Sequence, residues 1–295
     1  MPKILIILFI VCGFQQASSQ VKISPIKGGI SSNNSEINFI QINDSLAFFT
    51  QYYFIDRELE SKIFQAKKIN EAWYKTEDNS YNFKEGNSGN YCFTSVKNIS
   101  FFNICSHDFS NCDIYKLEDR KATNLRDLNS EAFNNKYNAQ PHFFSHNNKS
   151  FLAFVSDRKG GFGGLDIWIS VIDKSGNIGM PINAGPKINS PFNEITPFYN
   201  KHESKLYFSS NTDTNNIGGY DIYFSVGYPN MWGSRENKFE FNTEKDEMYF
   251  SMYNNIGYIS SNRNSDCENI DSCCASIYEV IATHEDTAKT LIEEP

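Results

Sequence analysis

A five-fold internal repeat is the feature of this sequence that most constrains its fold. An isoleucine followed by an aromatic residue recurs with spacings of 51, 53, 55 and 55 residues, at Ile63, Ile114, Ile167, Ile222 and Ile277. Before each isoleucine lies a short segment rich in aromatic and β-branched residues. Self-similarity at a fixed period of this length is typical of repeat architectures. Each copy is therefore expected to fold as one structural unit, stacked against its neighbours.

The two clearest copies indicate what that unit is. Residues 151–170 and 205–225 each contain two short apolar segments joined by a turn rich in glycine or asparagine. Short aromatic-rich segments bounded by turn residues are typical of β-strands. About four strands in some 50 residues is the pattern of a propeller blade. We expect an all-β fold, a β-propeller of five blades with about four antiparallel strands each. Six blades is the alternative, if one blade is split between the chain ends or one repeat hides an extra hairpin.

Polar and glycine residues recur with the strands and are predicted to be structural. Their carboxylate and amide groups suit the backbone N–H groups of tight turns. The alternative is a calcium-binding turn at residues 160–166, but that turn lacks several carboxylates and lies beside Arg158 and Lys159. No metal, cofactor or catalytic residue is therefore assigned. The recurrent residues are Asp113, Ile114, Tyr115, Asp157, Arg158, Gly163, Gly164, Asp166, Ile167, Trp168, Glu194, Pro197, Asn211, Gly218, Gly219, Asp221, Ile222, Tyr223, Asn262 and Arg263.

These motifs resemble a known family. Residues 156–168 (SDRKGGFGGLDIW) are similar to the PD40 or WD40-like repeat of TolB-type β-propellers, in particular to repeats of OmpA-associated envelope proteins of Bacteroidetes. Residues 193–197 (NEITP) and 205–211 (KLYFSSN) add to the likeness, which covers residues 36–280. The resemblance implies a non-catalytic protein-interaction scaffold of the bacterial cell envelope rather than an enzyme. Its partners would be envelope or outer-membrane proteins, and it would act as a monomer or as a subunit of a larger envelope complex.

The N-terminal segment predicts export. Lys3 is followed by an apolar run over residues 4–12 and by small residues at positions 17–19. This is the pattern of a signal peptide, and the run is too short to span a bilayer. We expect residues 1–19 to be cleaved, 20–281 to form the propeller and 282–295 to be an acidic flexible tail, in the periplasm or associated with the outer membrane. A lipoprotein attached through Cys12 is disfavoured, because Val11 is not a small residue.

Charge and cysteine content add two expectations. The formal net charge of −8 disfavours binding to nucleic acid or anionic lipid, and no further segment predicts a membrane span. Six of the seven cysteines follow the signal segment, and an even number in an exported chain suits disulfides. Cys105 is predicted to pair with Cys112, and Cys267 with Cys273 or Cys274. A metal site at the last three is the alternative, disfavoured by the absence of a nearby histidine.

Two glutamates support a different function. Glu36 and Glu194 occupy the same position of the repeat. Two carboxyl groups facing a central channel are the acid and base that a glycosidase needs. Repeat-related positions usually serve packing, whereas a hydrolase needs an asymmetric pair, so this interpretation ranks second. A carbohydrate-binding protein or glycoside hydrolase on a five-bladed propeller is the alternative function.

Overall fold

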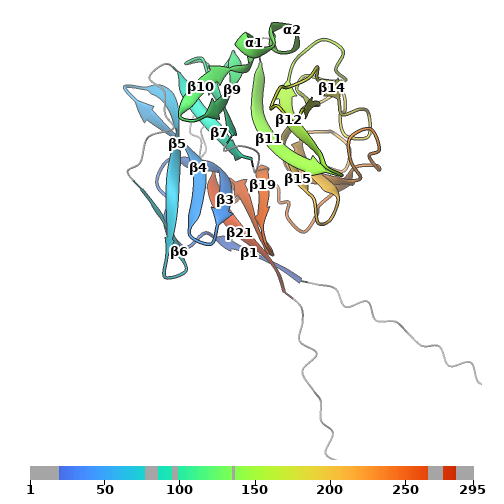
Figure 1. Cartoon of the computed structure of the whole chain (residues 1–295). Coiled ribbons are helices and arrows are strands. Elements are labelled where there is room, and N and C mark those ends of the chain that lie inside the picture. Colours follow the sequence, from blue (N-terminus) through green and yellow to red (C-terminus); the bar gives the residue numbers. More distant parts are fainter. Residues whose placement is uncertain (1–19, 77–85, 95–98, 135–136, 265–274, 284–295) are drawn as a thin grey trace, which may run out of the picture.

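The chain forms five four-stranded antiparallel sheets around a central axis, and one of them gains a fifth, parallel strand (Figure 1). This computed structural model describes residues 20–283, apart from residues 77–85, 95–98, 135–136 and 265–274. The first strands of the five blades contact one another around the axis. The prediction of an all-β, five-bladed propeller is confirmed.

The blades follow the chain in order, except that the fifth also takes the first strand. Blade one contains β3 (Ser35–Asn43), β4 (Leu46–Ile55), β5 (Glu58–Ile69) and β6 (Ala72–Lys75), with β2 (Gly28–Gly29) beside β6. Blade two contains β7 (Asn87–Phe93), β8 (Ser100–Cys105), β9 (Cys112–Glu118) and β10 (Lys121–Asn124). Blade three contains β11 (Asn138–His146), β12 (Lys149–Ser156), β13 (Asp166–Ile172) and β14 (Ile182–Asn183). Blade four contains β15 (Glu194–Asn200), β16 (Lys205–Ser210), β17 (Asp221–Val226) and β18 (Glu236–Asn237). Blade five contains β19 (Glu247–Tyr253), β20 (Ile256–Ser261), β21 (Ser276–Thr283) and β1 (Gln20–Pro25).

Blade five closes the ring with strands from both ends of the chain. β1 pairs with β21 in antiparallel register from Gln20–Thr283 to Pro25–Tyr278. A blade is therefore split between the termini, but the number of blades is still five. The predicted tail, residues 282–295, begins inside β21, because residues 282 and 283 are paired with β1. The rest of that tail, the predicted signal peptide and Cys267, Cys273 and Cys274 lie outside the described residues.

The recurring isoleucines form the structural centre of each blade. They lie on the third strands β5, β9, β13, β17 and β21, and each is at most 1 % exposed. Each blade packs its apolar face on the next: Phe101 of blade two and Phe154 of blade three belong to one buried cluster, and Phe151 of blade three and Phe208 of blade four belong to another. Because every blade must bury a strand of this kind, the isoleucine period is the period of the blades.

The repeated aspartates hold the turn before the third strand. Asp166 accepts hydrogen bonds from the N–H groups of Phe162 at 2.6 Å and Gly163 at 3.1 Å. Asp221 does the same for Ile217 at 2.7 Å and Gly218 at 3.1 Å. The glycines are needed because the next blade is close. A Cβ at Gly163 would lie 1.9 Å from the carbonyl oxygen of Phe192, and one at Gly218 would lie 2.0 Å from that of Lys245.

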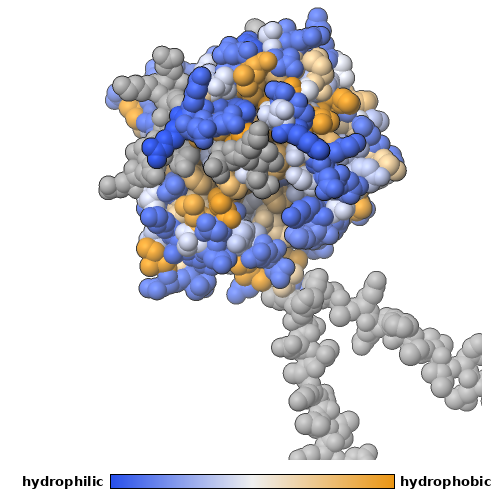
Figure 2. Space-filling model, in the orientation of Figure 1, coloured by the Kyte–Doolittle hydropathy of each residue, from blue (hydrophilic) through white to orange (hydrophobic). Residues whose placement is uncertain are grey.

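Two short helices and a mostly hydrophilic surface complete the fold. Helices α1 (Leu125–Leu128) and α2 (Ser130–Phe133) connect blades two and three, and are capped by Asn124 and Asn129. No helix in the described part of the chain is long and apolar enough to cross a bilayer. Figure 2 shows one face, on which exposed apolar residues form small patches between hydrophilic ones.

Candidate functional site

Each innermost strand contains a β-bulge whose central residue has a left-handed backbone. The pairing register shifts at this point in all five blades. Positive φ is uncommon for residues other than glycine, and it is costly for threonine and tyrosine. The five residues form a ring around the axis, called here the bulge ring. They are Asn38 (φ 54°), Asn90 (53°), Gln140 (53°), Thr196 (54°) and Tyr249 (56°).

The bulge ring is fixed by hydrogen bonds that run from blade to blade. The N–H group of each ring residue donates to a side-chain oxygen of the preceding blade, so every bulge is satisfied by its neighbour. The acceptors, in the order of the ring given above, are Ser260 Oγ (3.2 Å), Thr50 Oγ1 (3.0 Å), Asn103 Oδ1 (3.2 Å), Gln140 Oε1 (2.8 Å) and Thr196 Oγ1 (3.3 Å). This circular set of contacts holds the inner strands at a defined distance from the axis.

A hydrogen bond between two non-adjacent blades crosses the axis. The Tyr249 hydroxyl accepts from Gln140 Nε2 at 3.1 Å. Tyr249 belongs to blade five and Gln140 to blade three, so the contact passes over blade four. Tyr249 is only 9 % exposed. Together the two side chains bar the channel at the level of the bulge ring.

A cavity of about 190 Å³ lies along the axis next to this bar. It is lined from all five blades, by the bulge ring and by the strand residues that follow it. The described residues of its wall include no aspartate, glutamate, lysine or arginine. They are amides such as Asn38 and Gln41, hydroxyl groups such as Ser251, and rings such as Phe198 and Phe250. A wall of neutral hydrogen-bonding groups and apolar faces suits a small uncharged polar ligand.

Asn90, a residue of this wall, has a side-chain acceptor that is buried and unsatisfied. Its side chain is 5 % exposed, and its Nδ2 donates to Asn103 Oδ1 at 2.8 Å. Its Oδ1 has no hydrogen-bond partner. An unsatisfied buried polar atom is costly and rare.

His142 lines the same cavity and is held in one tautomer. Its Nε2 accepts the backbone N–H of Tyr199 at 2.9 Å, so in the neutral ring the proton is on Nδ1. Burial lowers the pKa of His142 from 6.5 to about 4. The ring is therefore neutral at physiological pH, in keeping with an uncharged wall.

This assignment predicts how stability depends on pH. Between about pH 6.5 and pH 4 the unfolded state takes up a proton at His142 that the folded state does not. Folding stability is therefore fully present above pH 6.5 and is lost as pH falls toward 4, by up to about 3 kcal/mol from this residue. Urea unfolding of the native chain and of His142→Gln across this range gives the contribution by difference. Parallel curves for the two proteins would contradict the assignment.

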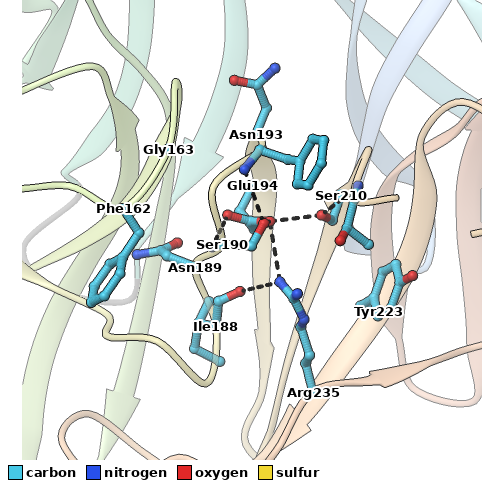
Figure 3. A network of polar contacts seen from close by, with 12 residues as sticks. Phe162, Gly163, Ile188, Asn189, Ser190, Asn193, Glu194, Ser210, Tyr223 and Arg235 are labelled. Carbon is cyan, nitrogen blue, oxygen red and sulfur yellow. Dashed lines mark hydrogen bonds and ion pairs between the residues drawn. The ribbon is translucent and has the colours of Figure 1, made fainter. Parts of the chain in front are cut away.

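Three buried glutamates mark the start of three inner strands. Glu36, Glu194 and Glu247 each precede a bulge-ring residue by two positions and are fully buried. Figure 3 shows the Glu194 site. There the carboxylate accepts from Ser190 N at 2.7 Å, Ser190 Oγ at 2.5 Å and Ser210 Oγ at 2.7 Å, and pairs with Arg235 at 3.4 Å.

The other two glutamates repeat this arrangement. Glu36 accepts from Ser32 Oγ at 2.6 Å and from Gln51 at 2.8 Å. Glu247 accepts from Thr243 N and Oγ1, both at 2.7 Å. Burial raises the pKa of Glu36 and of Glu194, although their hydrogen bonds oppose it. None of the three glutamates lines the cavity. Glu247 was not found from the sequence, although a serine or threonine four residues earlier is common to all three.

Of the recurrent residues named from the sequence, all of which the structure describes, only Pro197 lines the cavity. The others lie in turns and strands around it. Asn211 and Asn262 accept the N–H groups of Asn193 and Asp246, at 2.9 and 2.8 Å, where neighbouring blades meet. Gly164 and Gly219 leave room for the side chains of Asn193 and Asp246.

The other recurrent residues are placed as follows. Arg158 donates to Asn138 Oδ1 at 2.6 Å, Arg263 to Phe241 O at 2.6 Å, and Tyr223 to Asn216 Oδ1 at 2.7 Å. Asp113 pairs with Arg126 at 2.6 Å, Trp168 is buried, Tyr115 stacks on Phe102, and Asp157 is exposed.

The described cysteines form one disulfide and leave one buried free thiol. Cys105 and Cys112 are joined by a disulfide between β8 and β9, as predicted. Cys92 is free and lies in the cavity wall, where its sulfur accepts the N–H of Phe143 at 2.9 Å. Burial raises the pKa of Cys92 to about 12, so it is a neutral thiol. The described residues contain no group of three or more histidine, cysteine or acidic side chains placed to hold a metal.

Comparison with known proteins identifies solved structures with the same fold. No family model matches the sequence, and no curated protein does. Several solved structures match the fold. One is a thermostable family-43 glycoside hydrolase, with a TM-score of 0.57, 11% identity, and 87% of this chain and 91% of the other covered. A second is the catalytic domain of the family-62 α-L-arabinofuranosidase of Coprinopsis cinerea, with a TM-score of 0.56, 8% identity, and 90% and 98% covered. A third is a family-117 glycoside hydrolase of the marine bacterium Zobellia galactanivorans, with a TM-score of 0.55, 10% identity, and 89% and 90% covered.

Two expectations are corrected by these matches. The resemblance to PD40 and TolB-type repeat proteins is wrong, because the similar structures are five-bladed glycoside hydrolases and no repeat family matches. The prediction that the chain is not an enzyme is likewise overturned, because the matching structures are enzymes. At 8–11% identity the likeness establishes the architecture: the chain has the five-bladed β-propeller fold found in glycoside hydrolases of families 43, 62 and 117.

Proposed function

We propose that this chain is a carbohydrate-active protein whose central cavity binds one neutral sugar unit. The observation that carries the proposal is the cavity wall, which combines amides, hydroxyl groups and aromatic rings with no charged side chain among its described residues. Sugar hydroxyl groups both donate and accept, as amide side chains do, and the C–H faces of a sugar ring pack on aromatic rings.

The similar structures indicate which sugars to test first. Three of those that match are α-L-arabinofuranosidases, and another is a β-xylosidase/α-arabinofuranosidase solved with xylotriose. Pentoses are therefore the first candidates. The pair of glutamates suggested by the sequence as acid and base is not at this site, because Glu194 and Glu36 are fully buried and neither lines the cavity.

The test is a binding titration with a cavity-filling variant. The chain from Gln20 onward is titrated by calorimetry with D-xylose, L-arabinose and D-galactose. We expect millimolar affinity for at least one of them. Ile40→Trp, which fills the cavity from a partly buried position of β3, should abolish this binding. Ile69→Trp, at an exposed position of β5, is the matched control and should bind normally.

Hydrolysis is measured in the same preparations with nitrophenyl arabinofuranoside and xyloside. Release that is lost in Ile40→Trp and kept in Ile69→Trp would extend the proposal to catalysis, whereas binding without release would restrict it to recognition. If none of the sugars binds, the proposal is wrong. Partnership with envelope proteins and a place in the periplasm or at the outer membrane stay predictions, which a pull-down from the envelope fraction would test.

A further inference from the structure

A groove continues the cavity at one end. It has a volume of about 870 Å³ and lies over the β15–β16 and β19–β20 hairpins, along residues 199–203 and 253–255. Phe198 and Met252 line both the groove and the cavity. The two hollows therefore meet at these side chains, on the hairpin side of the propeller.

The cavity is sealed at the opposite end. The Tyr249–Gln140 hydrogen bond bars the channel there, and Asn90 and Thr196 beside it are 5 % and 4 % exposed. At the hairpin end, by contrast, Phe93 is 44 % exposed. A ligand therefore enters from the hairpin side and stops at the bar. A site of this shape accepts the end of a chain and excludes its interior.

The groove offers amides and an aromatic ring, as the cavity does, and it differs from the cavity in also being lined by the charged side chains of Lys201 and Glu203. Asn254 and Asn255 are exposed amides, and Tyr253 is a partly exposed ring. Glu203 accepts from the Tyr207 hydroxyl at 2.6 Å and pairs with Lys205 at 3.4 Å, so its charge is compensated within blade four. The groove thus offers amides and an aromatic face to further units of a neutral chain.

We propose that the site recognises the end of a neutral oligosaccharide, with the terminal unit in the cavity and the next units along the groove. This inference rests on the proposed function, because it requires the cavity to bind sugar. It adds the direction of binding and the length of the ligand. It also assigns Tyr253 a role in affinity for the chain and none for the single unit.

The experiment compares single sugars with short chains. D-xylose is paired with xylotriose and L-arabinose with α-1,5-arabinotriose, each titrated by calorimetry. In at least one pair the trisaccharide should bind about tenfold more tightly than the monosaccharide. Tyr253→Ala should remove about that factor for the trisaccharide and leave the monosaccharide unchanged, because a stacked ring contributes on this scale. Tyr74→Ala, at an exposed tyrosine of β6, is the matched control.

The outcomes separate the two proposals. If a monosaccharide binds but its trisaccharide gains nothing, the inference about chain ends is wrong and the proposed function stands. If a trisaccharide still binds to Ile40→Trp, the chain lies on the groove without entering the cavity, and the inference is also wrong. If no sugar of either length binds, the proposed function fails and the inference with it.

Discussion

A chain that begins at residue 26 is expected to lose at least about 4 kcal/mol of folding stability relative to one that begins at Gln20, or to lose its cooperative unfolding transition. The missing residues are those of β1, which pairs with β21 along six positions. Val21 and Ile23 pack against the cluster that contains Tyr278 and Val280. Without β1 these contacts disappear, blade five has three strands, and the edge of β21 becomes exposed.

Urea unfolding followed by near-ultraviolet circular dichroism measures this loss. A synthetic peptide of residues 20–25, added in excess, should restore part of the stability by pairing with β21. Equal unfolding midpoints for the two chains would show that ring closure contributes little, contrary to the contacts described.

Replacing Glu247 with alanine is the substitution for which we expect the largest loss, about 3–5 kcal/mol. Glu247 is fully buried and pairs with Arg263 at 3.1 Å, and Ser261 Oγ donates to it at 2.8 Å. Alanine would leave the guanidinium, itself largely buried, without its counter-charge, and the donors of Thr243 without their acceptor. The loss of folding stability comes from leaving these buried groups without partners, and it exceeds the net contribution of the ion pair itself.

The measurement is equilibrium urea unfolding of Glu247→Ala beside Glu236→Ala, an exposed glutamate of β18. The control should change stability by no more than about 0.5 kcal/mol. Adding Arg263→Met to Glu247→Ala should recover part of the loss, because the stranded charge is removed. A loss below about 1 kcal/mol for Glu247→Ala would mean that water enters and replaces its contacts.

The blades could be predicted from the sequence because every blade solves the same packing problem. Each needs a buried residue at the centre of its third strand and a turn that clears the next blade, so Ile222, Asp221 and Gly218 have counterparts in blade three. The same reasoning explains the wrong family assignment. An aspartate holding a glycine turn is a requirement of blade geometry, and unrelated propellers can meet it with similar residues.

The site could not be predicted in the same way. The bulge ring is defined by a backbone conformation that strand pairing imposes. Its five positions hold two asparagines, a glutamine, a threonine and a tyrosine, so they share no residue pattern. The sequence placed Glu36 and Glu194 at one repeat position, but their hydrogen-bond partners decide what they do. Arg235 lies 41 residues after Glu194, in a loop whose return to that strand no local pattern reveals. Helices α1 and α2 are too short to show helical periodicity.

The split blade has a consequence for how the chain becomes a folded protein. β1 is synthesised before every other described strand of the propeller, and its partner β21 after all of them. During synthesis β1 therefore stays without its partner until the strands β2 to β20 have been made. Its sequence, QVKISP, suits that wait, because Lys22 and Pro25 discourage pairing with other strands. Closure of the ring depends on pairing the two described strands that lie furthest apart in the sequence, so we infer that the final step of folding is slow and occurs only after synthesis has passed Thr283.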